Sequence, residues 1–133
     1  MSIRIKAEIV YEGILVVQAD LDKKFRSRLL VDTGASYSAL TETFIRSNPP
    51  LIIRPSGRTW SAGTAGSASQ VDMPSFSIRR LSVGPIVKHD LEFVRLDLPA
   101  DIKIDGLLGV NFLRDFRVTF DFVDGWIEFA ERK

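Results

Sequence analysis

Leu29-Leu30-Val31-Asp32-Thr33-Gly34-Ala35-Ser36 is the most informative stretch of the sequence. Its apolar start predicts a strand, which delivers the carboxylate of Asp32 to the strand end. Thr33 and Gly34 then turn the chain, because glycine permits strained backbone angles and a threonine hydroxyl can fix a loop by hydrogen bonding. Taken alone, the Asp-Thr-Gly tripeptide is explained equally well as an ordinary turn, since all three residue types favour turns.

A second segment far downstream weakens that simpler explanation. It reads Asp105-Gly106-Leu107-Leu108-Gly109-Val110-Asn111-Phe112-Leu113. With both segments in view, the chain resembles the retropepsin-like aspartic proteases of the bacterial and archaeal type. Residues 30–35 match that family's active-site loop, residues 107–109 match its distal apolar-apolar-Gly segment, and residues 60–73 fall where its flap belongs. The closing residues 120–129 resemble the terminal strands of those members, so the resemblance covers nearly the whole chain.

The resemblance implies a mainly β fold: a single-lobed, closed β-barrel with a flap hairpin and one or two short helices, paired into a homodimer. It makes Asp32 the catalytic aspartate. Support of the active-site loop is assigned to Thr33, Gly34, Leu107, Leu108 and Gly109, with Thr33 locking the loops of two copies together. Contacts to substrate are assigned to Gly34, Ala35, Ser36, Ala62, Gly63 and Thr64.

Residues 58–73 are dominated by Gly, Ala, Ser and Thr, and they have two interpretations. By composition they could form a flexible linker. They could also form a hairpin whose small side chains let its backbone approach a ligand closely. The viral members of the family have a flap rich in Ile, whereas residues 58–73 are rich in small residues. This difference leaves the substrate preference open.

The aspartic protease mechanism needs two carboxylates that share one proton. The sequence holds a single Asp-Thr-Gly, whereas Asp105-Gly106 and Asp124-Gly125 lack the hydroxyl residue and read as turns. The second carboxylate must therefore come from another copy of the chain, which predicts a homodimer with its site on the two-fold axis. We expect residues 3–10 and 126–129 to form the interface, as exposed strand edges.

Composition narrows the function classes further. The 133 residues carry a net charge of +1, which disfavours nucleic acid as a partner. With zero Cys and one His, His89, thiol chemistry and multi-His metal sites are excluded, and we expect no cofactor and no metal. No apolar run approaches the ~20 residues of a membrane span. We expect one domain, residues 1–133, in the cytoplasm.

Most predicted elements are short strands, beginning with the alternating residues 3–9. Short helices are predicted at residues 41–45, with Thr41 as N-cap, and at residues 110–116. Alternating runs on either side of Asp124-Gly125 predict a hairpin.

The leading hypothesis is an aspartic endopeptidase that cuts peptide bonds between hydrophobic residues of a peptide or protein substrate. The alternative is a dimeric peptide-binding or assembly module of the same fold with weak or no activity. A phosphoryl-accepting role for Asp32 is disfavoured, because Gly34 stands where a second acid would hold Mg²⁺. Ala35 provides no hydroxyl to stabilise a charged dyad, so we expect an activity optimum in mildly acidic conditions.

Overall fold

The computed structural model describes residues 2–63, 70–99 and 101–132. Alternating apolar and polar residues produce strands throughout this part of the chain, as the period of two predicts. The strands are β1 (Ser2–Lys6), β2 (Glu8–Val10), β3 (Ile14–Leu21), β4 (Phe25–Val31), β5 (Ser38–Thr41), β6 (Arg54–Gly63), β7 (Gln70–Val83), β8 (Ile86–Leu96), β9 (Gly106–Leu108), β10 (Phe116–Asp121) and β11 (Trp126–Glu131). The helices are α1 (Glu42–Ser47) and α2 (Val110–Leu113).

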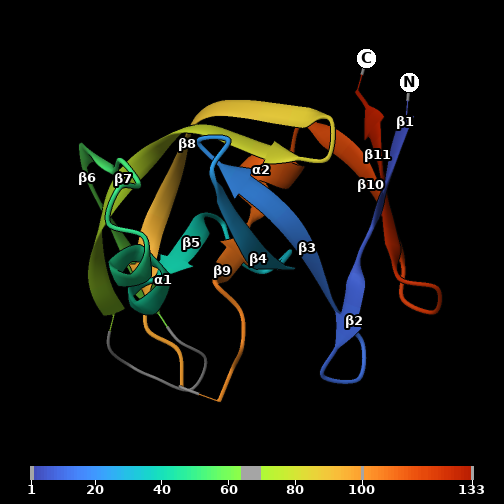
Figure 1. Cartoon of the computed structure of the whole chain (residues 1–133), viewed down its shortest axis with the longest axis horizontal. Helices are drawn as coiled ribbons and strands as arrows, with labels where there is room; N and C mark the ends of the chain where they lie inside the picture. Colours follow the sequence, from blue (N-terminus) through green and yellow to red (C-terminus); the bar gives the residue numbers. More distant parts are fainter. Residues whose placement is uncertain (1, 64–69, 100, 133) are drawn as a thin grey trace.

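The larger sheet closes on itself and forms a barrel. Its strand order is β2-β3-β4-β9-β5-β8-β7-β6, and an additional pairing of β3 with β7 closes the ring through six strands. The predicted mainly β fold with a closed barrel is confirmed. Figure 1 shows β6 and β7 leaving the barrel as a long hairpin, while the N- and C-termini lie side by side at the opposite end.

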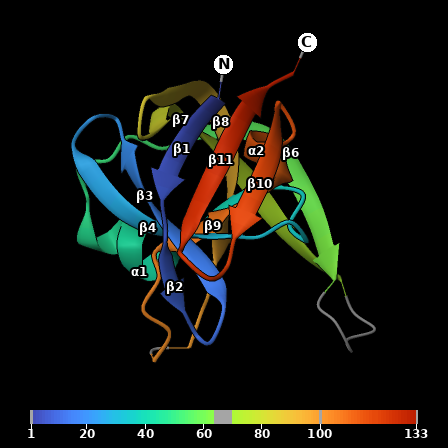
Figure 2. The same ribbon diagram turned by 90° about the vertical axis from the view of Figure 1, so that its right-hand side faces the viewer.

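A smaller sheet holds both ends of the chain. Its order is β1-β11-β10, so β11 lies in the middle with an antiparallel partner on each side. Figure 2 shows these three strands side by side across the front of the molecule. The expectation that residues 126–129 form an exposed edge is therefore wrong, because both edges of β11 are paired within the chain.

The first predicted strand is divided in two. Ala7 interrupts it, and its N–H donates to the carbonyl of Gly125 over 2.9 Å. The residues before this break pair with β11, whereas those after it pair with β3. The alternating sequence contains no sign of this change of partner, because Gly125 is distant in the sequence.

The two short helices confirm the prediction in number but differ in extent. The N-cap of α1 is Thr41, as predicted, and its hydroxyl accepts from the N–H of Phe44. By contrast α2 ends at Leu113, and β10 already begins at Phe116. The predicted helix over residues 110–116 is thus too long, because Phe116 packs as a strand residue against Phe112 and Phe129.

The core fills the barrel and continues under the smaller sheet. Its largest fully buried side chains include Phe93, Phe112 and Phe129. Within the described residues, no helix is long and apolar enough to cross the hydrophobic layer of a membrane. The same residues contain no group of three or more His, Cys, Asp or Glu that could hold a metal ion.

Candidate active site

Asp32 lies at the end of β4, where β9 holds the strand in place. The two strands run parallel, with Leu30 beside Leu107 and Val31 beside Leu108. The ladder extends one step further, because the N–H of Asp32 donates to the carbonyl of Leu108 over 3.0 Å. The structure thus brings together the two segments that the sequence singled out.

The loop after β4 folds back on the carboxylate of Asp32. The N–H of Gly34 donates to Asp32 Oδ1 over 2.9 Å, and the N–H of Ala35 donates to the Asp32 carbonyl over 3.3 Å. Asp32 is half-buried, whereas Thr33 and Gly34 are exposed. The carboxylate is therefore oriented by the loop's own backbone while one side of it remains open to solvent.

The backbone of the loop is also tied to α2. The carbonyl of Ala35 accepts from the N–H of Val110 over 2.8 Å, and that of Ser36 accepts from the N–H of Asn111 over 3.2 Å. These bonds satisfy N–H groups in the first turn of the helix, which have no partner within it. The active-site loop and α2 consequently form one hydrogen-bonded unit.

A polar network built on Ser38 and Asn111 supports this unit. The N–H and the hydroxyl of Ser38 both donate to Asn111 Oδ1, at 3.0 and 2.9 Å. Ser38 Oγ accepts from the N–H of Gly109, and Asn111 Nδ2 donates to the carbonyl of Glu92 over 2.8 Å. Sequence reasoning assigned no role to Ser38 or Asn111. Asn111 lay inside the quoted segment, but no local pattern indicates that its partner is Ser38.

Two glycines let the supporting backbones approach closely. A Cβ at Gly109 would lie 2.5 Å from the carbonyl oxygen of Tyr37, and one at Gly106 would lie 2.0 Å from that of Ala39. Both distances are shorter than van der Waals contact allows. These positions are therefore restricted to glycine by crowding.

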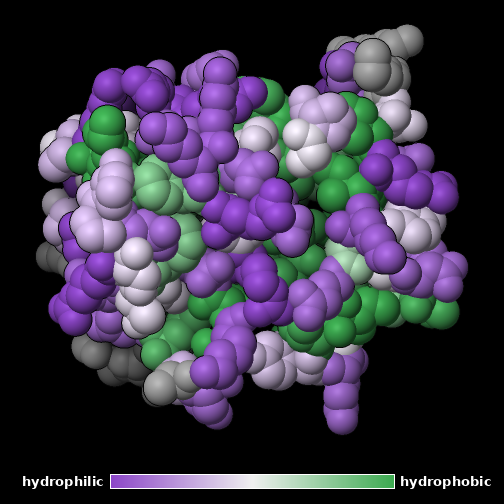
Figure 3. Space-filling model, in the orientation of Figure 1, coloured by the Kyte–Doolittle hydropathy of each residue, from purple (hydrophilic) through white to green (hydrophobic). Residues whose placement is uncertain are grey.

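An open pocket of about 570 Å³ adjoins Asp32. Its lining is apolar apart from Asp32 and Thr33: Gly13, Ile14, Leu15, Leu30, Val31, Phe120 and Phe122. Figure 3 shows apolar side chains gathered over the β2–β3 hairpin and the turn between β10 and β11. The carboxylate of Asp32 thus borders an apolar surface.

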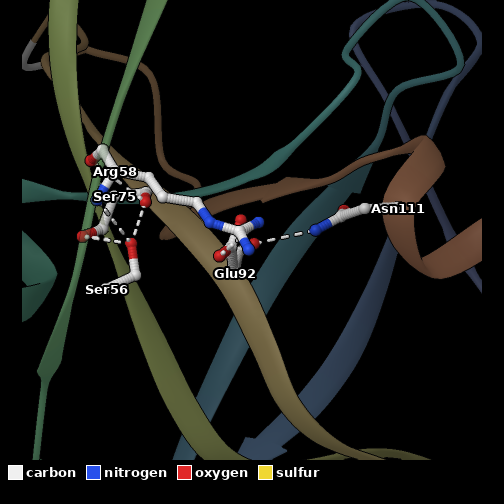
Figure 4. A network of polar contacts seen from close by, with 5 residues as sticks. All are labelled: Ser56, Arg58, Ser75, Glu92 and Asn111. Carbon is white, nitrogen blue, oxygen red and sulfur yellow. Dashed lines mark hydrogen bonds and ion pairs between the residues drawn. The ribbon is translucent and has the colours of Figure 1, made fainter.

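A second pocket, of about 560 Å³, lies on the α2 side of the loop and is polar. Ser36 and Tyr37 line it, and Arg58 forms an ion pair with Glu92 across 3.5 Å. Figure 4 shows this ion pair between the Asn111 side chain and the hydroxyls of Ser56 and Ser75. Exposed His89 lines the same pocket. Ser36 therefore lines this polar pocket and does not line the pocket beside Asp32.

The described parts of the small-residue segment, residues 58–63 and 70–73, belong to two antiparallel strands. β6 pairs with β7, and the backbones of Ala62 and Gly63 lie opposite Val71 and Gln70. For these described residues the linker interpretation is wrong and the predicted hairpin pairing is confirmed. The close approach of this backbone to a ligand remains a prediction. Thr64, the third predicted flap residue, lies outside the described residues.

A family model described as aspartyl protease matches residues 17–112, which is more than half of the chain. The chain belongs to this aspartyl protease family. The match spans the Asp32 loop, the hairpin and the distal segment through Phe112. The protease is therefore an aspartic-type endopeptidase by family.

Several solved structures share the fold of this chain. A retropepsin-like aspartic protease from Rickettsia conorii is 18% identical, with a TM-score of 0.61, covering 97% of this chain and 90% of that one. EIAV protease complexed with the inhibitor HBY-793 is 19% identical, with a TM-score of 0.55 and coverage of 81% and 92%. The retroviral protease-like domain of Ddi1 from Leishmania major is 12% identical, with a TM-score of 0.53 and coverage of 89% and 94%. No curated protein sequence matches significantly.

Proposed function

We propose that the protease cleaves peptide bonds with a pair of Asp32 carboxylates, one from each copy of a homodimer. The observation that carries this proposal is the lining of the pocket beside Asp32. Asp32 is the one acidic residue among the described residues that line that pocket. Two carboxylates are needed for acid and base chemistry on one water, so the second must come from outside the protomer.

In the proposed dimer the two carboxylates share one proton. The ionised Asp32 removes a proton from water, which attacks the carbonyl carbon of the scissile bond, while the protonated partner donates to the carbonyl oxygen. The tetrahedral intermediate then collapses: a hydroxyl proton returns to the partner carboxylate, the C–N bond breaks, and the leaving amine takes the proton that Asp32 removed from water. The N–H of Gly34, which donates to Asp32 Oδ1 over 2.9 Å, holds one carboxylate oxygen in a fixed orientation.

The proposed preference for hydrophobic residues on both sides of the scissile bond rests on the apolar lining. Ile14, Phe120 and Phe122 line the pocket beside Asp32. An apolar pocket favours apolar side chains, because their transfer from water releases roughly 25 cal/mol for each Å² buried. In the proposed dimer, the two-fold axis repeats this lining on both sides of the bond.

The test is cleavage of a diverse peptide mixture, with and without a statine-type inhibitor, followed by mass spectrometry. We expect cuts between hydrophobic residues, inhibition by the statine compound, and a loss of about a thousandfold or more in the Asp32→Asn variant. The variant should keep the fold and the dimer, since the change removes a charge repelled by its partner. Turnover by Asp32→Asn would reject the dyad.

The same experiment separates the enzyme from the alternative, a dimeric peptide-binding or assembly module. Such a module would retain peptides without cutting them, and Asp32→Asn would leave retention unchanged. The roles of Thr33 as a lock and of Gly34, Ala35 and Ser36 as peptide contacts remain predictions. The cytoplasmic location also remains a prediction, which fractionation of the native cells would test.

A further inference from the structure

We propose that Arg58 is a positioning residue of the protease: its ion pair with Glu92 fixes the direction of the outer half of the β6–β7 strand pair relative to the loop that carries Asp32. The outer half consists of residues 59–63 of β6 and residues 70–74 of β7. The inference rests on the proposed function, because it concerns how this strand pair meets a peptide that Asp32 cleaves.

The ladder between β6 and β7 is interrupted part-way along. The register shifts between Pro55 and Thr59. Residues 56–58 of β6 therefore stand opposite Ser75 alone. An excursion of this kind is a β-bulge, which leaves residues without ladder partners and bends the strand. The main-chain ladder consequently does not fix the direction in which the outer half leaves the base of the strand pair.

Two serine hydroxyls hold the backbone of this bulge. Ser56 Oγ and Ser75 Oγ are hydrogen-bonded to each other, and Ser75 Oγ donates to the carbonyl of Arg58 over 3.3 Å. Ser56 Oγ also accepts from the N–H of Arg58 over 3.3 Å. Gly57 lies between Ser56 and Arg58 with a φ of +77°, a left-handed conformation that favours glycine. The side chain of Arg58 therefore starts from a defined position.

The Arg58 side chain reaches from the bulge to β8. Its guanidinium Nη1 lies 3.5 Å from Glu92 Oε1, and Figure 4 shows the side chain extended toward that carboxylate. In the strand order, β7 lies between β6 and β8, so the ion pair crosses a strand. Within the described residues, Glu92 forms no other ion pair, and Lys88 on the same strand is paired with Asp115. The Arg58–Glu92 contact thus fastens the bulge to β8.

The backbone of Glu92 contacts the support of the Asp32 loop. Its carbonyl accepts from Asn111 Nδ2 over 2.8 Å. The N–H of Asn111 in turn donates to the carbonyl of Ser36 over 3.2 Å. Glu92 therefore joins the bulge, through its side chain, to the loop that orients the Asp32 carboxylate, through its backbone. A substitution of the Glu92 side chain leaves the backbone contact in place.

The exposure of the ion pair indicates a role in position and not in stability. The side chains of Arg58 and Glu92 are 67% and 23% exposed, and an exposed pair of this kind adds little to the free energy of unfolding. Ala62 and Gly63, which are predicted to contact substrate, follow Arg58 on β6. At about 3.3 Å per residue of strand, they lie roughly 13 Å or more beyond the bulge, so a small change of direction at Arg58 displaces them substantially.

Charge reversal and a swap of the pair test this role. Arg58→Glu brings two carboxylates together, and the KM for a hydrophobic peptide should rise about tenfold, with kcat within about twofold of the parent. The pH–rate profile should not move, because Arg58 does not contact Asp32. The swapped variant, Arg58→Glu with Glu92→Arg, restores opposite charges and should return KM to within about threefold of the parent.

The matched control is Arg54→Glu. Arg54 is an exposed residue of β6 before the bulge and forms no ion pair within the described residues. The control changes the net charge by the same amount as Arg58→Glu, and its KM should equal that of the parent. Arg58→Lys, which keeps the positive charge, should stay close to the parent. All of these variants should melt within about 3 °C of the parent, since an exposed pair contributes little to stability.

Hydrogen exchange read by mass spectrometry follows the strand pair without a substrate. In Arg58→Glu, the amides of residues 59–63 and 70–73 should exchange about fivefold faster, because the outer half has lost its anchor. The swapped variant should exchange at the parent rate. Residues 76–78, at the base of the strand pair, should be unchanged in every variant.

Two outcomes would overturn the proposal: a KM of Arg58→Glu equal to that of Arg54→Glu, or a swapped variant no better than Arg58→Glu alone. A loss of activity matched by a fall in melting temperature would also overturn it, since Arg58 would then be structural. A chain that cleaves no peptide, but shows the change in exchange and its restoration by the swap, would keep the anchoring role of the ion pair and reject the proposed enzyme. A chain that cleaves peptides with Asp32, with KM and exchange both unaffected by Arg58→Glu, would keep the enzyme and reject the positioning role.

Discussion

The loop that carries Asp32 and the segment that holds it differ in burial and in tolerance of change. Thr33 and Gly34 are exposed, and a Cβ added at Gly34 would approach only Asp32 Oδ1, at 3.3 Å. In the supporting segment, Leu108 and Gly109 are buried, and a Cβ at Gly109 would meet the Tyr37 carbonyl oxygen at 2.5 Å. An exposed loop therefore orients the carboxylate of Asp32, and a buried, closely packed segment holds that loop in position.

The largest expected effect comes from crowding the supporting segment. Gly109→Ala forces the backbones of Ala35 and Tyr37 to move, because the new Cβ would lie within 2.8 Å of both carbonyl oxygens. Such overpacking against backbone should lower the free energy of unfolding by about 3 kcal/mol or more, measured in urea. Peptide cleavage should be lost with the fold.

The matched change on the loop is Gly34→Ala, which adds the same methyl group. The free energy of unfolding should stay within about 1 kcal/mol of the parent, because the added Cβ meets only a side-chain oxygen at 3.3 Å. Cleavage should fall about tenfold, since the carboxylate is displaced. Equal losses of stability in Gly34→Ala and Gly109→Ala would contradict the contrast between loop and support.

A change in the network of Ser38 and Asn111 should lower the free energy of unfolding by an intermediate amount. Asn111→Ala leaves the N–H and hydroxyl of fully buried Ser38 without their acceptor. Leaving buried donors unsatisfied should cost about 1–3 kcal/mol in urea unfolding. The Ser38→Ala variant is the control for coupling: the double variant should cost less than the sum of the two single ones.

The smallest effect should come from a hydroxyl on the loop itself. Ala35→Ser places a donor three residues after Asp32, where it can stabilise the charged form of the dyad. The pH–rate profile should keep its bell shape and move to lower pH by roughly one unit or less. A profile that stays in place or moves upward would show that position 35 does not touch the dyad.

Much of the site was visible in the sequence, because its two segments have strong local signatures. The apolar run before Asp32 predicted β4, and the Leu-Leu-Gly run at residues 107–109 was matched to the family's distal segment, but the parallel pairing of β4 with β9 was not predicted. The N-cap of α1 at Thr41 was equally local. What was missed depends on contacts between distant residues: Ser38 with Asn111, and Ala7 with Gly125. Periodicity indicates which face of a strand is buried, but it does not indicate which other strand or residue lies beside it.

The place of β11 was missed for the same reason. Its alternation predicted a strand, and the predicted hairpin with β10 is present. The turn of that hairpin spans residues 122–125 and not only Asp124-Gly125. Its other neighbour, β1, lies at the opposite end of the sequence. The sequence therefore indicated a terminal edge where the structure has a central strand.

The pairing of β1 with β11 within one chain has a consequence for how activity depends on protein concentration. Ser2 lies opposite Ala130 and Lys6 opposite Trp126, so each protomer completes its own terminal sheet without borrowing a strand. Folding and assembly are then separate steps, and in the proposed dimer the second is bimolecular. Below the dissociation constant, specific activity rises in proportion to total protein, so dilution alone would switch the enzyme off while every protomer remains folded.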